Sequence, residues 1–182
     1  MTSTETSTCG PVGEFVGVRV LVTGGTKGIG AAVAVRFAEA GADVVVAART
    51  PVDEPPAGRF VAADIATADG TATLAAQATQ LLGGIDVLIN NAGSQTYIPG
   101  GALDATDDDW YHDLDTNLMS AVRLDRALLP GMIAQNRGVI IHITSGQARL
   151  PGAASLPYAA AKAATTVYSK GWPTRSASTG SG

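Results

Sequence analysis

The chain has 182 residues, of which 46% are hydrophobic and 15% are charged, and its formal net charge is −4. These values fit one globular domain with a sizeable core and exclude a disordered or fibrous chain. Lys and Arg form no basic stripe, so nucleic acid is not an expected partner, and no apolar run approaches the ~20 residues of a membrane span. Cys9 is the only cysteine, which excludes an internal disulfide and fits a reducing cytoplasm.

The first sixteen residues, 1–16, are expected to form a flexible leader. This segment is rich in Thr and Ser, and it lacks both the cationic start and the apolar stretch of a signal peptide. One domain is expected to follow over residues 17–170, because we find no internal repeat and no second composition within that range.

From Val18 onward, short β-branched runs alternate with Ala-rich helical stretches, a pattern typical of repeated βαβ units. The expected strands are the apolar runs 18–22, 43–47, 60–63, 87–90 and 139–143. Because these runs are apolar throughout, they predict a parallel sheet covered by helices on both faces. The predicted fold class is therefore α/β, a Rossmann-like doubly wound parallel sheet in three α/β/α layers.

Two helices have clear predicted ends. The first spans residues 30–40 and closes at Gly41, a residue suited to the left-handed turn that ends a helix. A long helix is expected to start at Thr106, which has capping-box spacing to Asp109, and to run to about Gln135.

The glycine-rich segment 23–30, the glycine loop, follows the first strand and opens the first helix. A tight turn there directs backbone N–H groups outward, and the helix N-terminus offers positive potential to a pyrophosphate. The predicted cofactor-binding residues of this loop are Gly24, Thr26, Lys27, Gly28, Ile29 and Gly30. The glycine spacing differs from the more common GxGxxG, so a purely structural glycine turn is the alternative.

At the end of the second strand, Ala48 occupies the place of the carboxylate that binds an unphosphorylated ribose, and Arg49 follows it. The side chains of Arg49 and Lys27 can both face a ribose 2′-phosphate, which a guanidinium grips in bidentate fashion. The sequence therefore predicts a preference for NADP(H), with NAD(H) as a second cofactor. The alternative is that both are solvated surface cations.

Tyr158 and Lys162 are four residues apart on a predicted helix, so they share a face. The Lys162 ammonium near the phenol favours phenolate, which suits Tyr158 to general acid–base work. Ser145 lies just past the fifth strand, where it can hydrogen-bond a substrate oxygen. A YxxxK pattern alone is common, but together with Ser145 and the glycine loop it indicates a nicotinamide-dependent redox site.

In order and spacing, these motifs resemble the short-chain dehydrogenase/reductase family over nearly all of residues 18–170. The resemblance implies a catalytic tetrad of four residues, in which the asparagine holds a water in a proton relay to the lysine. The tetrad residues are Asn117, Ser145, Tyr158 and Lys162. The resemblance also implies that segment 90–93 supports the central sheet. Further implied cofactor contacts are Asp64, Ile65, Asn91, Ala92, Gly93, Tyr158 and Lys162.

The expected activity is that of an NADP(H)-dependent oxidoreductase that interconverts an alcohol and a ketone or aldehyde by hydride transfer. A small carbonyl or alcohol compound is the expected partner, its identity is not indicated by the sequence, and no metal site is predicted. Members of the family that the chain resembles are expected to be homo-oligomers. The alternatives are an NADP(H)-binding protein without turnover and an unstable fragment.

The resemblance stops at Trp172, so we expect residues 171–182 to be an aberrant, disordered tail and the sheet to lack its last strands. Reverse-translated and read one base out of phase, this tail can give the family's Leu-Ala-x-Glu-Val and Gly-Val-Arg patterns. Our hypothesis is a base lost near the codon of Gly171, and the alternative is a genuine Gly/Ser/Thr-rich tail or linker. Such a loss leaves strand 139–143 as an exposed apolar edge.

Overall fold

A computed structural model describes residues 13–171. Within this range the strands form one parallel sheet in the order β3-β2-β1-β4-β5. The strands are β1 (Arg19–Thr23), β2 (Asp43–Ala48), β3 (Arg59–Ala62), β4 (Val87–Asn90) and β5 (Val139–His142). Each predicted strand agrees with the observed one to within one residue at both ends, so the prediction of a parallel sheet is confirmed.

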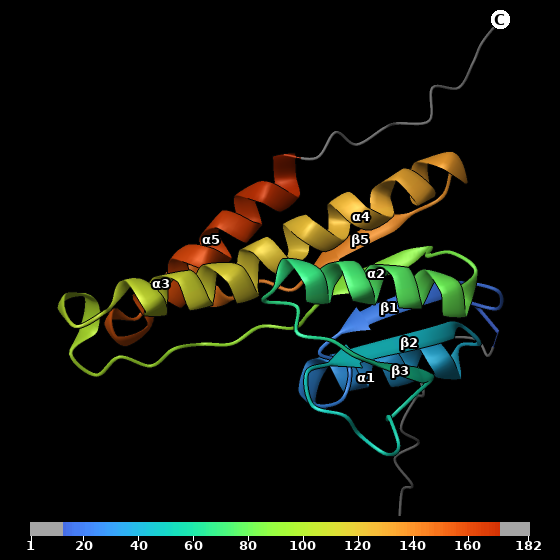
Figure 1. Ribbon diagram of the computed structural model, residues 1–182, viewed down its shortest axis with the longest axis horizontal. Helices are drawn as coiled ribbons and strands as arrows, with labels where there is room; N and C mark the ends of the chain where they lie inside the picture. The colour runs from blue at the N-terminus through green and yellow to red at the C-terminus, as the bar shows by residue number, and fades with distance from the viewer. Residues whose placement is uncertain (1–12, 172–182) are drawn as a thin grey trace, which may run out of the picture.

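Helices cover both faces of this sheet, which confirms the doubly wound, three-layer prediction (Figure 1). Helix α1 (Gly28–Glu39) packs on one face. The opposite face carries α2 (Ala68–Leu82), α4 (Ser120–Ala134) and α5 (Leu156–Gly171). Three short 3-10 turns lie in the loops, at η1 (Gly101–Leu103), η3 (Gly146–Ala148) and η4 (Ala153–Ser155).

The core is divided by the sheet into two apolar clusters. One lies between the sheet and helices α2 and α4, and includes Leu21, Leu74, Leu88 and Leu124, all with no exposed surface. The other lies between the sheet and α1 and includes Val20, Val22, Val46 and Ala34. Both faces of the central strands are therefore buried, which explains why the middle residues of these strands are apolar.

The long helix predicted from Thr106 has a confirmed start. The Thr106 hydroxyl accepts a hydrogen bond from Asp109 N (3.2 Å), and the Asp109 carboxylate accepts one from Thr106 N (2.9 Å). The predicted run is interrupted, however, because α3 (Asp107–Leu114) is joined to α4 by a π-helical turn, η2 (Asp115–Met119). Such turns inside helices are frequent at functional sites.

The N-terminal part of the described chain is fastened to the end of α1. Residues 13–16, which the sequence analysis placed in the leader, form a turn in which Phe15 N donates to Ala40 O (2.9 Å). The Phe15 ring lies 4.9 Å from the Phe37 ring. The rest of the predicted leader, the tail 172–182 and the out-of-frame hypothesis for it lie outside the described residues.

Strand β5 is an edge of the sheet within residues 13–171. On its α1-facing side, Val139 is 52% exposed and Ile141 is 40% exposed, as expected for an apolar edge that no neighbouring element covers. In the same range, no helix is long and apolar enough to span a bilayer.

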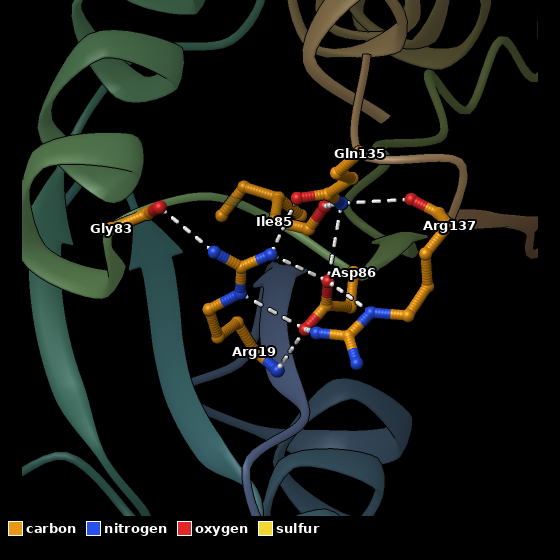
Figure 2. Close-up of polar contacts among 6 residues, drawn as sticks. All are labelled: Arg19, Gly83, Ile85, Asp86, Gln135 and Arg137. Carbon is orange, nitrogen blue, oxygen red and sulfur yellow. Dashed lines mark hydrogen bonds and ion pairs between the residues drawn. The ribbon is translucent and has the colours of Figure 1, made fainter. Parts of the chain in front are cut away.

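A buried carboxylate joins the amino ends of the three neighbouring strands β1, β4 and β5 (Figure 2). Asp86, directly before β4, accepts hydrogen bonds from Arg19 N and Nε (3.0 and 2.9 Å) and from Arg137 Nε (2.9 Å). Gln135 Nε2 donates to Asp86 (3.1 Å) and to Ile85 O (2.8 Å). These contacts, mainly those with Arg19, lower the pKa of Asp86 to about 2.

Candidate active site

The glycine loop is held at the carboxyl end of β1 by Thr23. Its hydroxyl oxygen accepts hydrogen bonds from Asn91 N and Ala92 N, both at 3.0 Å. The Asn91 side chain in turn donates to Thr23 O (2.9 Å) and to Gly24 O (3.3 Å). Segment 90–93, which begins at the last residue of β4, therefore supports the loop by direct contacts.

Gly28 and Gly30 show why the loop needs glycine. Gly28 has φ +57°, a conformation that other residues rarely adopt, and open space lies where its Cβ would stand. A Cβ on Gly30 would lie 2.3 Å from Gly24 O and 2.4 Å from Asn91 Nδ2. The loop can therefore pack closely against segment 90–93 while leaving space above the start of α1.

The N-terminus of α1 carries unused hydrogen-bond donors. Its N-cap is Lys27, whose side chain makes no capping hydrogen bond. The N–H groups of the first turn have no acceptor within the helix, and the helix dipole adds positive potential at this end. These are the properties that a pyrophosphate requires, so the residues present fit a dinucleotide.

The residues predicted around the ribose and adenine lie at the start of α1 and just after β2 and β3. Lys27 and Arg49 are both exposed, and neither side chain has a hydrogen bond or ion pair with any other residue of the described range. The Asp64 carboxylate accepts a hydrogen bond from Ala66 N (3.1 Å) in the turn before α2. The Ile65 side chain is buried in the core, so only the backbone of this residue is available to a ligand.

Asn117 lies in the π-helical turn η2 and is almost fully buried. Its amide nitrogen donates to Ser94 O (2.8 Å) and Asp113 O (2.9 Å), and its backbone carbonyl accepts a hydrogen bond from Thr165 Oγ1 (2.9 Å). Its side-chain oxygen is buried and has no hydrogen-bond partner within residues 13–171. A buried polar atom without a partner is costly, and it marks a position for a water or a ligand atom.

Tyr158 and Lys162 lie one turn apart on α5, as predicted. The Lys162 Nζ atom is 5.8 Å from the centroid of the Tyr158 ring and donates to Ile143 O (3.0 Å) at the end of β5. Burial leaves Lys162 only 5% exposed and lowers the pKa of its ammonium. A buried ammonium with a single neutral acceptor leaves donors for further partners.

Gly93 lies against the side chains of both Asn117 and Lys162. A Cβ on Gly93 would lie 2.6 Å from Asn117 Oδ1 and 3.3 Å from Lys162 Nζ, so both atoms lie against this residue. Ser145 follows β5, and its hydroxyl accepts a hydrogen bond from Gln147 N (3.2 Å) at the start of η3. The predicted tetrad residues thus come from η2, α5 and the loop after β5, at the carboxyl end of the sheet.

Sequence reasoning missed three groups near this site. Asp113 is fully buried one turn before Asn117, and Thr165 binds the Asn117 carbonyl. The Gln147 side-chain oxygen is buried without a partner. Asp113 precedes Asn117 by four residues, a helical spacing that gives a sequence signal only when the asparagine is already known. Nothing in the sequence indicates the other two.

Comparison with known proteins gives a consistent result. The family model for short chain dehydrogenases matches residues 18–180. The uncharacterized oxidoreductase YvrD of Bacillus subtilis (strain 168) is 37% identical, over 84% of this chain and 60% of its own length. The 3-oxoacyl-(acyl-carrier-protein) reductase FabG of Vibrio cholerae serotype O1 is 31% identical, over 88% of this chain and 68% of its own length.

Among solved structures, the NADH-dependent reductase A1-R′ complexed with NAD is similar to this chain with a TM-score of 0.80. Its sequence is 28% identical, and the match covers 86% of this chain and 72% of that one. The chain therefore spans about 60% of the length of YvrD and a larger share of the other two proteins.

Proposed function

The chain belongs to the short-chain dehydrogenase family, and from that premise we propose that it is an NADP(H)-dependent oxidoreductase that interconverts an alcohol and a ketone or aldehyde. One observation carries the proposal: the glycine loop and the cluster of Gly93, Asn117 and Lys162 lie at the same end of the sheet. A dinucleotide bound at α1 would run along this end of the sheet toward Tyr158, because ligands bind outside the carboxyl ends of parallel strands.

In the direction of carbonyl reduction, bound NADPH supplies the hydride. The Tyr158 hydroxyl donates its proton to the substrate oxygen, and the Ser145 hydroxyl donates a hydrogen bond to the same oxygen. The Lys162 ammonium, 5.8 Å from the Tyr158 ring centroid, stabilises the phenolate that remains. Asn117 Oδ1, buried and unpartnered, holds a water through which the proton is replaced.

Purified protein should oxidise NADPH in the presence of compounds from a panel of ketones and aldehydes. Tyr158→Phe removes the proton donor and should lower turnover by about 100-fold to 10,000-fold. Tyr111→Phe is the matched control, because Tyr111 is 63% exposed on α3 and should keep full turnover. Unchanged turnover in Tyr158→Phe would refute the mechanism.

The preference for the phosphorylated cofactor rests on Arg49 and Lys27. Both are exposed cations with no competing partner in residues 13–171, and a 2′-phosphate can pair with both. NADPH should bind more tightly than NADH, and Arg49→Asp should reverse the order, which titration by fluorescence can measure. Equal affinities in the unaltered protein would refute the preference and leave NADH, the cofactor named for A1-R′.

A cofactor-binding protein without turnover is the second candidate, because the contacts that hold the glycine loop do not involve Tyr158 or Lys162. The glycine loop and its support all lie before residue 94. In this case NADPH raises the melting temperature of the protein while no carbonyl compound in the panel is reduced. A melting temperature that NADPH does not change excludes this candidate.

A further inference from the structure

The segment directly after Gly93, residues 94–98, bridges two parts of the candidate site. At one side it meets α3, where Ser94 Oγ lies 3.0 Å from His112 Nε2. At the other side Gln95 Nε2 donates to Ser155 Oγ (2.9 Å) and Ile98 N donates to Ala154 O (2.7 Å). Ser155 lies three residues before Tyr158 in the chain, so the segment lies between the asparagine side and the tyrosine side of the site.

A buried carboxylate fastens the middle of this segment. Asp113 has no exposed surface, and within residues 13–171 its carboxylate accepts hydrogen bonds only from Thr96. Thr96 N donates to both carboxylate oxygens at 3.3 Å, and Thr96 Oγ1 donates to Oδ1 at 3.2 Å. No cation pairs with Asp113 in that range, and burial raises the pKa of its carboxyl group.

The same residue also positions Asn117. The Asp113 carbonyl and the Ser94 carbonyl share the two hydrogens of the Asn117 amide nitrogen, at 2.9 and 2.8 Å. Asp113 therefore holds the bridging segment with its side chain and the asparagine with its backbone. A leucine at position 113 would fill the same buried space without the cost of desolvating a carboxylate, so packing alone does not explain an acid here.

We propose that Asp113 is a positioning residue that holds residues 94–98 as one wall of the substrate site and fixes their distance from Asn117. This role rests on the proposed function. The wall it holds lies between Asn117 and the start of α5, where the oxygen of a bound carbonyl compound must meet Tyr158. Loss of the link should weaken substrate binding more than it slows the chemical step, because no tetrad side chain is removed.

The test compares Asp113→Leu, Asp113→Asn and Thr96→Val with Asp108→Asn, an exposed aspartate in the first turn of the same helix. Asp113→Leu should raise KM for the most active carbonyl compound of the panel about 10-fold or more, the equivalent of a lost hydrogen bond to a charged group. Thr96→Val should raise KM by a smaller factor. Asp113→Asn should stay within about 3-fold, because one amide oxygen can accept both Thr96 donors.

Hydrogen exchange measured by mass spectrometry gives a second readout that does not need turnover. Asp113→Leu and Thr96→Val should exchange faster over residues 94–98, with the exchange of the glycine loop unchanged. Unchanged exchange, or faster exchange with unchanged KM, overturns the proposal, and a lower melting temperature does not support it. If the unaltered protein shows no turnover, the proposed function fails, and the exchange data alone decide whether Asp113 holds the segment.

Discussion

The amino and carboxyl ends of the strands differ in how their buried polar groups are satisfied. At the amino end, Asp86 is 3% exposed and accepts hydrogen bonds from Arg19, Gln135 and Arg137 (Figure 2). At the carboxyl end, the first turn of α1 has no side-chain cap, and the buried side-chain oxygen of Asn117 has no partner. Satisfied buried groups stabilise a fold, whereas unsatisfied ones reduce its stability and remain available for a ligand.

The difference indicates that the groups that stabilise the fold and the groups that serve the reaction lie at opposite ends of the strands. The middle residues of the central strands β1, β2 and β4 are buried and separate the two ends, so each end can be altered with little effect on the other. Substitutions that remove a polar side chain at the carboxyl end should therefore change turnover and cofactor binding with little loss of stability. Substitutions at the amino end should do the reverse.

The largest effect is expected for Lys162→Met. Removal of the ammonium near Tyr158 should lower turnover by about 100-fold or more. The free energy of unfolding should stay the same or rise, because burial of the charged group already lowers its pKa and a methionine avoids that cost. Lys170→Met, an exposed lysine on the same helix, serves as control and should change neither quantity. Full turnover in Lys162→Met would contradict the proposal that the carboxyl end of the strands serves the reaction.

Gly30→Ala tests the contact between the glycine loop and segment 90–93. The new Cβ would lie 2.3 Å from Gly24 O, so the loop must shift, at a cost of ~2 kcal/mol in the free energy of unfolding. NADPH binding, followed by fluorescence, should be lost with it. Gly131→Ala in α4 is the matched control, since no atom lies within 4 Å of its Cβ position, and it should stabilise the protein slightly. Wild-type NADPH affinity in Gly30→Ala would show that the loop has more room than these distances allow.

Asp86→Asn tests the amino end of the strands. The pKa of Asp86 is lowered from 3.8 to about 2, so ionisation of this group stabilises the folded state by about 2 kcal/mol at neutral pH. A lowered folded pKa means that this contribution is present above pH ~4 and is lost as the pH falls toward ~2. Urea unfolding at several pH values should show lower stability in Asp86→Asn and a flatter decline over that window. NADPH affinity should not change, and a loss of affinity would show that the amino and carboxyl ends of the strands are coupled.

The smallest effect is expected for Thr106→Ala, which removes the hydroxyl that caps α3. Loss of an N-cap costs ~1 kcal/mol, seen as a small decrease in melting temperature. Thr106→Ser keeps the hydroxyl and should restore most of the difference. Because α3 leads directly into the turn that holds Asn117, a decrease in turnover larger than the decrease in stability would indicate that the cap also serves the site.

Local sequence patterns were sufficient for the strands and for their order along the chain. The strands read as apolar runs because both faces of the sheet are covered, and the capping box at Thr106 and Asp109 needs only four residues to form. The helical spacing of Tyr158 and Lys162 likewise follows from four consecutive peptide units. The π-helical turn at Asp115–Met119 was not predicted, since no local pattern distinguishes an extra residue in a helix from the helix itself.

The sequence by itself determined the parallel α/β architecture, the glycine loop and the helical pairing of Tyr158 with Lys162. Each of these depends on neighbours in the chain, whose geometry the backbone dictates. Only the tertiary structure decided which buried polar groups are satisfied: Asp86 by two arginines, Asp113 by Thr96, and Asn117 incompletely. These partners are brought together by packing across the sheet and between helices, and hydrogen bonds over such separations follow from the fold as a whole.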